Sequence, residues 1–310
     1  MALPFDLLER VRSASPKVEG ARWAETVSRY REALELKLRG VDAPVRRKVV
    51  DGFLWHIPYA DRGLGRLIAR SRRLPTMFEI EQARRLGAHG HTMVDIGANV
   101  GTTSIPRVAL GYFSRAVVAE PADVDFRCLV QNVVANRLRG RVLPDNCAIY
   151  SHTGTVRFRQ QEQSGVHRVS AKDKDGEAPS FTLDDWLDQR GIRPRQVDFV
   201  KSDAQGSEGH VFAGAEDLLR LRRAIWQIEY WPKGLHALGT SEAELQDQLR
   251  EWFTDFVLLG RRGDGNEDPV AHPIVALTDT IEELALGPRG FTNLLLYPTS
   301  RAAIRGGASS

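Results

Sequence analysis

The sequence predicts an α/β fold in which a seven-stranded, mostly parallel sheet follows a small helical segment. From residue 92 onward, short β-rich runs alternate with helical stretches, which is typical of parallel strands covered by helices on both faces. The strand candidates are residues 92–96, 116–119, 141–146, 197–201, 224–229, 256–259 and 293–297. The helical candidates are residues 121–138, 182–189, 209–221 and 241–252.

Two segments interrupt this alternation. Residues 154–170 predict an extra hairpin inserted after the third strand. Residues 260–290, before the last strand, are loop-like, with one turn of helix expected at 280–286. We therefore expect the sheet domain to span residues 76–300 and a flexible tail to cover residues 301–310.

The first 75 residues carry an excess of positive charge. They contain 16 lysines and arginines against 9 acids, whereas the rest of the chain contains 27 against 31. Apolar residues recur at helical spacing between Trp23 and Leu38. We expect residues 1–75 to form a basic helical appendage whose charges cover a solvated face; a binding surface is the alternative.

The composition excludes several classes of protein. The chain has 310 residues, 42% of them apolar and 27% charged, with a formal net charge of +3, so it is neither disordered nor polybasic overall. Cys128 and Cys147 are too few for a disulfide scaffold or a cysteine-rich zinc module, and no cluster at metal-ligand spacing indicates a metal. With no export signal and no apolar run near the ~18 residues of a membrane span, we expect a cytoplasmic protein.

The strongest motif follows the first predicted strand. There a glycine turn contains Gly97, Asn99 and Gly101, and Asp95 stands two residues before it. The spacing lacks the middle glycine of a dinucleotide-binding turn, and a carboxylate at residue 95 would repel a pyrophosphate. Asp95 instead suits a cationic or amino-bearing ligand such as S-adenosylmethionine (SAM), and Glu120 at the end of the second strand suits its ribose hydroxyls. The alternative is that Asp95 caps a turn and Glu120 starts a helix.

Asp145 and Asn146 end the third predicted strand. An acid or amide beside a small residue can contact the amino group of an adenine ring, so we include both residues in the cofactor site. Alternatively, Asp145 and Asn146 lie in a loop where their side chains hydrogen-bond to the backbone of their own turn, which accounts for these residue types equally well.

These residues, with others downstream, resemble the FkbM-type SAM-dependent methyltransferases. The resemblance covers about residues 79–297 and rests on the segments at residues 94–104, 119–121, 132–136, 154–156, 181–187, 200–208 and 292–295. It implies a Rossmann-like sheet of the class I methyltransferase type, methylation of hydroxyl groups on sugars or polyketide products, and a role for Glu79 in closing the SAM pocket. The chain departs from the family pattern at Ser202 and at Gln205, where a glutamate is usual.

Methyl transfer to a hydroxyl needs a group that takes the hydroxyl proton. Asp203 follows the fourth strand, Lys201 alternates with it, and Glu229 ends the neighbouring strand, so we expect these three residues at the reacting centre. Alternatively, Asp203 binds the amino group of the cofactor. The alternative role of Lys201 is to form a structural ion pair. The three histidines near this edge, any of which could instead be the base, are His167, His210 and His236.

We therefore expect a SAM-dependent O-methyltransferase with a small hydroxylated acceptor, no membrane association and a possible homodimer. The first alternative is methylation of nucleic-acid ribose 2′-hydroxyls, motivated by the basic segment. We do not expect a nucleic-acid partner, because aromatic residues are not interleaved with the basic ones. The second alternative is a catalytically silent binding module.

Overall fold

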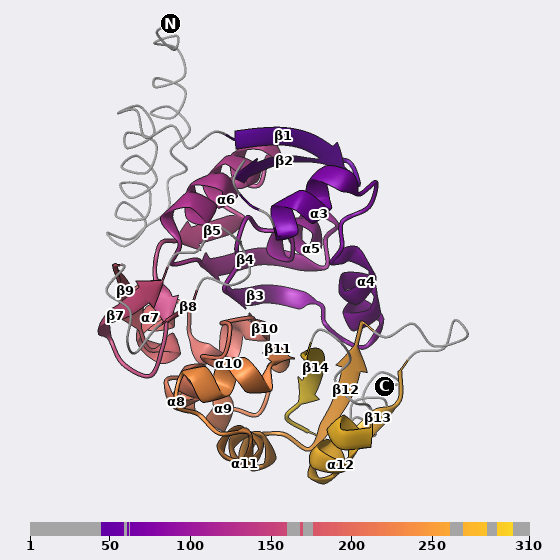
Figure 1. Ribbon diagram of the computed structural model, residues 1–310, viewed down its shortest axis with the longest axis vertical. Coiled ribbons are helices and arrows are strands. Elements are labelled where there is room, and N and C mark those ends of the chain that lie inside the picture. The colour runs from indigo at the N-terminus through magenta and orange to yellow at the C-terminus, as the bar shows by residue number, and fades with distance from the viewer. Residues whose placement is uncertain are drawn as a thin grey trace, which may run out of the picture. The chain divides into compact units, whose positions relative to one another are not determined.

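The computed structural model describes residues 45–58, 61, 63–159, 168–169, 176–260, 269–283 and 290–299. All of these belong to one compact unit that begins at Ala43. Its centre is an eight-stranded sheet (Figure 1) with the order β13 (Ala271–Pro273), β12 (Asp255–Leu259), β14 (Thr292–Tyr297), β11 (Ile225–Tyr230), β10 (Val197–Ser202), β3 (Gly90–Ile96), β4 (Phe113–Ala119) and β5 (Val142–Asp145). Six strands run in one direction, and β13 and β14 run in the other.

The seven predicted strands are confirmed, and the predicted mostly parallel α/β sheet with them. The sequence analysis missed the eighth strand, β13, because it is only three residues long and lies at the sheet edge in a segment predicted to be loop-like. A 3₁₀ turn (Ile274–Ala276) and α12 (Leu277–Glu283) follow it, so the helix begins three residues before the predicted one.

Helices cover both faces of the sheet. The residues of α3 (Leu64–Arg70), α4 (Met77–Arg85), α5 (Ser104–Ala109) and α6 (Asp123–Ala135) pack with one face. The other face is covered by α7 (Leu183–Gln189), α8 (Glu208–Ala213), α9 (Glu216–Arg220), α10 (Pro232–Ala237) and α11 (Glu242–Trp252). The predicted helix 209–221 is divided into α8 and α9 at Gly214, where a Cβ would lie 2.5 Å from the Tyr150 carbonyl oxygen. None of the described helices is long and apolar enough to cross a bilayer.

The prediction that residues 1–75 form a separate helical appendage is wrong for residues 45–58, whereas residues 64–70 are helical, as α3. Strands β1 (Val45–Val50) and β2 (Phe53–Pro58) form an antiparallel hairpin. Trp55 and Ile57 of this hairpin are buried in the same apolar cluster as the sheet, so no packing boundary falls at residue 75. The stretch rich in β-branched and aromatic residues forms strands because it has an apolar surface to cover. The helix expected between Trp23 and Leu38 and the tail 301–310 lie outside the described residues.

Two asparagines of α6 hold the hairpin in place. The Asn136 side chain accepts from the Leu54 amide and donates to the Leu54 carbonyl oxygen, both at 2.9 Å. Asn132 accepts from the His56 amide at 2.5 Å and donates to the carbonyl oxygens of His56 (3.1 Å) and Val100 (2.8 Å). The side-chain amides of Asn132 and Asn136 therefore form hydrogen bonds with the backbone at the outer edge of β2, as a neighbouring strand would. They also link the hairpin to the glycine turn through Val100.

The basic charge of the N-terminal segment lies mainly on this hairpin and on α3. Residues 45–73 contain eight of the 16 lysines and arginines of the first 75 residues but only two of the nine acids. Both acids have internal partners: Asp51 accepts from the Leu74 amide, and Asp61 accepts from the amides of Gly63 and Gly65. The positive charge therefore belongs to the unit that contains the sheet.

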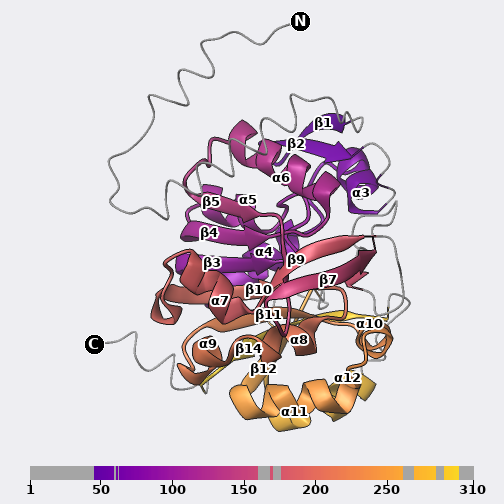
Figure 2. The same ribbon diagram turned by 90° about the vertical axis from the view of Figure 1, so that its left-hand side faces the viewer.

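The inserted hairpin is confirmed. It belongs to a second, four-stranded sheet with the order β6 (Ala148–Ile149), β9 (Glu177–Phe181), β7 (Gly154–Arg159) and β8 (Arg168–Val169). Figure 2 shows β7 and β9 beside the main sheet, near α7 and α8. Cys128 and Cys147 are both buried, and neither forms a disulfide.

Candidate active site

The winding of the sheet reverses between β3 and β10. The chain proceeds from β3 through β4 to β5 on one side, and from β10 to β11 on the other. In open α/β sheets, ligands bind beyond the carboxyl ends of the strands at such a switch point. The glycine turn after β3 and Asp203 after β10 lie at this position.

Backbone geometry explains the glycines of the turn. Gly97 has φ +70°, and a Cβ there would lie 2.1 Å from the Asp203 carbonyl oxygen, so only glycine lets the two strand ends approach this closely. The amides of Gly97 and Ala98 both donate to the Ala119 carbonyl oxygen at 3.0 Å. Gly101, at φ +93°, has Ile105 and Leu129 where a side chain would point.

Glu120 organises the other side of the turn. Its two carboxylate oxygens accept from the amides of Asn99 (2.7 Å) and Ala122 (2.8 Å). Asn99 has φ +52°, and its side chain donates to Asp125 at 3.2 Å. The structure therefore brings Glu120, Asn99 and the glycines together as predicted.

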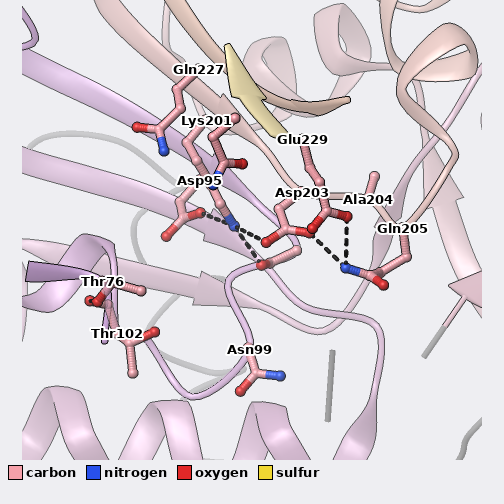
Figure 3. A network of polar contacts seen from close by, with 12 residues as sticks. Thr76, Asp95, Asn99, Thr102, Lys201, Asp203, Ala204, Gln205, Gln227 and Glu229 are labelled. Atoms are coloured by element: carbon pink, nitrogen blue, oxygen red, sulfur yellow. Dashed lines mark hydrogen bonds and ion pairs between the residues drawn. The ribbon is translucent and has the colours of Figure 1, made fainter. Parts of the chain in front are cut away.

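Polar side chains continue across the sheet from β3. Asp95, Lys201 and Gln227 are paired in register on β3, β10 and β11. The Lys201 Nζ donates to the Gly97 carbonyl oxygen at 2.9 Å and lies 3.3 Å from Asp95 Oδ1 and 3.6 Å from Asp203 Oδ2 (Figure 3). Burial alone would lower the pKa of Lys201, but Asp95 and Asp203 outweigh it and raise that pKa, so the ammonium stays charged.

Asp95 is fully buried next to Lys201. Its side chain is 0% exposed, and its Oδ1 lies 3.3 Å from the Lys201 Nζ. Asp95 is still inside β3, one residue before the strand ends. In this structure Asp95 is the ion-pair partner of Lys201, and its predicted contact with the cofactor stays a prediction.

Asp203 and Glu229 lie close together, as predicted from their positions at the ends of β10 and β11. The Gln205 Nε2 donates to Asp203 Oδ1 at 2.7 Å and to Glu229 Oε2 at 3.2 Å. Figure 3 shows Lys201, Asp203, Gln205 and Glu229 in one chain of contacts. The Asp203 side chain is 37% exposed, whereas Glu229 is buried, and this burial together with the charge of Asp203 raises the pKa of Glu229 well above its usual value.

Glu79, on α4, is a third acid at this part of the site, with Asp203 and Glu229. It accepts from the Asn293 Nδ2 at 2.9 Å, and Asn293 is paired with Glu229 in the sheet. Burial raises the pKa of Glu79, and the charge of Asp203 adds to this effect. At the start of α4, the Thr76 hydroxyl donates to the Thr102 carbonyl oxygen at 2.9 Å, which links the helix to the glycine turn.

The sequence analysis missed two buried charged residues at the site. Arg107 of α5 donates to Gln227 Oε1 at 2.7 Å and lies 4.6 Å above the Phe199 ring, and burial lowers its pKa to about 10. Glu208, at the start of α8, accepts from the Ala204 amide at 2.8 Å, and burial raises its pKa to about 7. An arginine between apolar residues in the stretch 105–109 was a usable signal for a buried charge.

Asp145 and Asn146 have structural partners. The Asp145 carboxylate pairs with Arg190 and accepts from the Trp186 indole at 3.1 Å. Asn146 donates to the carbonyl oxygens of Glu120 (3.0 Å) and Pro121 (3.2 Å). Asp145 is thus turned toward α7, contrary to its predicted role, because Arg190 supplies the counter-charge. Asn146 remains beside Glu120.

The histidines do not join the acids. His210 stacks on Tyr150 with ring centroids 4.1 Å apart, and His236 is exposed, 3.6 Å from Glu242. His167 lies outside the described residues. Among the described residues, no group of three or more His, Cys, Asp or Glu side chains has the geometry of a metal site.

Most residues of this site, from Asp95 to Glu229, lie in a segment that matches a family model. The model of the FkbM methyltransferase domain matches residues 95–256, more than half of the chain, so the chain belongs to the FkbM methyltransferase family. The resemblance seen in the sequence is confirmed. No curated protein matches the chain.

Several solved structures are similar to the chain. The FkbM methyltransferase of Methylobacillus flagellatus KT is 17% identical, with a TM-score of 0.42 over 67% of this chain and 44% of that protein, so the chain spans less than half of its length. M. jannaschii TYW2, in complex with AdoMet, is 11% identical, with a TM-score of 0.40 over 84% and 89%. The B. subtilis tRNA methyltransferase TrmK is 12% identical, with a TM-score of 0.37 over 74% and 69%.

Proposed function

We propose that this protein is a SAM-dependent O-methyltransferase that acts on a hydroxyl of a small acceptor, such as a sugar or a polyketide-like molecule. The observation that carries the proposal is the position of Asp203. Its partly exposed carboxylate lies at the switch point, within 3.6 Å of the Lys201 ammonium and beside the glycine turn. The family assignment supports the methyltransferase reaction.

The residues at the turn fit an adenosyl donor. Glu120 is fixed by two backbone amides, and its carboxylate suits ribose hydroxyls. Gly97 lets the turn after β3 approach Asp203 closely, which places the two parts of the site side by side. Asn146, whose side chain donates to the Glu120 carbonyl oxygen, remains the candidate for contacting the adenine ring.

The residues after β10 and β11 fit the removal of a hydroxyl proton. Bound SAM supplies an activated methyl group. The Asp203 carboxylate would take the proton of the acceptor hydroxyl when that oxygen accepts the methyl group. Lys201 and Gln205 hold that carboxylate in place, and Glu229 lies beside it to share the proton.

Calorimetric titration with SAM tests the cofactor assignment. We expect micromolar binding by the wild type. Glu120→Gln should weaken it at least about tenfold, because the amide no longer accepts from both backbone amides and the ribose hydroxyls. Asp123→Asn, which changes an exposed acid three residues away, should bind like the wild type. Binding of NADH with no heat from SAM would end the proposal.

Product analysis tests the acceptor chemistry. Incubation with SAM and a panel of hydroxylated sugars and macrolactones should yield a product with one additional methyl group on oxygen, identified by mass spectrometry and NMR. Asp203→Asn should abolish this turnover while it leaves SAM binding within about threefold, since Asp203 acts on the acceptor proton. Methylation at nitrogen or carbon would contradict the O-methyltransferase assignment.

Nucleic-acid ribose 2′-hydroxyls are the second candidate acceptor. The observation that favours them is that the basic residues of segment 45–73 belong to the sheet unit. If this candidate holds, binding of a single-stranded RNA should weaken steeply with salt. Arg66→Gln with Arg70→Gln should then weaken it several-fold more than Arg220→Gln on α9. RNA binding that is absent or insensitive to salt excludes this candidate.

A further inference from the structure

The site contains more buried acids than bases. Four carboxylic acids from α4, β3, the end of β10 and β11 interact electrostatically with two bases: Glu79, Asp95, Asp203 and Glu229 with Arg107 and Lys201. A fifth acid, Glu208 of α8, interacts with Asp203 and Glu229. If all were ionised, the cluster would hold an excess of three negative charges. Its other polar members, Gln205, Gln227 and Asn293, are neutral.

Two of the acids, Glu79 and Glu229, are linked through Asn293 on β14. Glu229 on β11 is paired in register with Asn293 on β14, and the Asn293 side chain donates to Glu79 at 2.9 Å. Lys201 and Arg107 are already engaged elsewhere, by Asp95 and Asp203 and by Gln227. Glu79 and Glu229 therefore have amide partners, but the chain supplies neither with an ion pair among its described residues.

Other buried polar atoms of the cluster also lack partners. Glu208 Oε2 and Arg107 Nη1 have no hydrogen-bond partner within the described part of the chain. A buried carboxylate without a counter-charge is costly, so such groups take up a proton or a cation. Burial accordingly raises the pKa of Glu79, of Glu229 and of Glu208, the last to about 7.

We propose that Glu79 and Glu229 are charge-selective residues, which bind a positively charged ligand in preference to the same ligand without that charge. This inference rests on the proposed function. SAM carries a sulfonium charge that its demethylated product, S-adenosylhomocysteine (SAH), lacks. The acids thus favour the donor before the reaction and release the product after it.

The selectivity must depend on pH in a defined direction. A raised pKa means that the acid is protonated, and neutral, below that pKa. A cation favours the ionised acid, so SAM binding displaces a proton, and SAM affinity rises with pH as Glu79 and Glu229 ionise. SAH affinity has no such dependence. The other charged groups that face these two acids are Asp203, Glu208, Arg107 and Lys201.

Calorimetry of SAM and SAH binding between pH 6 and 8 tests the proposal. For the wild type we expect SAM to bind at least about tenfold more tightly than SAH where Glu79 and Glu229 are ionised, with the ratio falling as the pH is lowered and these acids take up protons. Parallel titrations in phosphate and Tris buffers should show proton release of about half a proton or more with SAM and almost none with SAH.

Variants assign the effect to the named acids. Glu79→Gln can still accept from Asn293, so it should fold, retain SAH affinity within about twofold and lose about fivefold or more in SAM affinity. Glu229→Gln should act in the same direction. Glu216→Gln, which removes a largely exposed acid on α9, should change neither affinity.

The two proposals fail in different ways. Absence of SAM binding at any pH would overturn the proposed function. Binding of SAM and SAH with equal, pH-independent affinities and without proton release would overturn the charge selectivity alone. A Glu79→Gln variant that lost SAM and SAH affinity equally would show that Glu79 shapes the pocket rather than selects charge.

Discussion

Lys201→Met is expected to lower the free energy of unfolding by about 3–5 kcal/mol, because it removes one partner of a buried ion pair. Asp95 is 0% exposed, and within the described residues neither of its carboxylate oxygens has a hydrogen-bond partner. The ammonium 3.3 Å away is therefore its compensation. The lysine also donates to the Gly97 carbonyl oxygen, so its loss separates β10 from the glycine turn. Urea denaturation followed by circular dichroism measures the change.

The double variant Asp95→Asn with Lys201→Met separates charge from packing. It removes both charges, so it should recover at least half of the lost stability. Lys233→Met, which replaces an exposed lysine on α10, should stay within about 0.5 kcal/mol of the wild type. A Lys201→Met protein as stable as the wild type would contradict the account of this pair.

Gly97→Ala is expected to abolish SAM binding and to destabilise the protein by about 3 kcal/mol. The residue has φ +70°, which costs an alanine about 1 kcal/mol. Its Cβ would also lie 2.1 Å from the Asp203 carbonyl oxygen, a backbone atom that moves only if β10 moves. The displacement would shift the Asp203 side chain as well. Thermal unfolding with and without SAM measures both effects.

Gly111→Ala is the matched control. Gly111 has φ +75°, but nothing lies within 4 Å of a Cβ built there. This variant should therefore show only the conformational cost of about 1 kcal/mol and unchanged SAM binding. Equal effects of the two substitutions would mean that the close approach of β3 and β10 has no special role in the site.

The sheet was predictable from sequence because its strands are buried on both faces. Runs such as that of β12 (Asp255–Leu259) are short, mostly apolar and separated from the next by helical patterns, which indicates a buried strand. The hairpin at residues 45–58 was not predictable. Its arginines resemble a solvated helical face as long as the residues that contact the hairpin are unknown. Those partners, Asn132 and Asn136, lie about 80 residues away along the chain.

The site was predictable at strand ends and less so inside the strands. Asp203, Glu229 and Glu120 come just after or at the end of a strand, where position alone brings them to the switch point. Asp95 and Asp145 were assigned to the ligand, but each has a basic partner, Lys201 or Arg190, which sequence spacing does not reveal. Ion pairs between distant segments depend on how side chains fill the interior.

The most direct test of the central claim is a crystal structure of the protein with SAH. The account predicts the adenosyl group at the turn after β3, with its ribose hydroxyls on the Glu120 carboxylate and its sulfur on the side of Asp203. A ligand bound elsewhere, or a Glu120 side chain that faces away from it, would contradict the account.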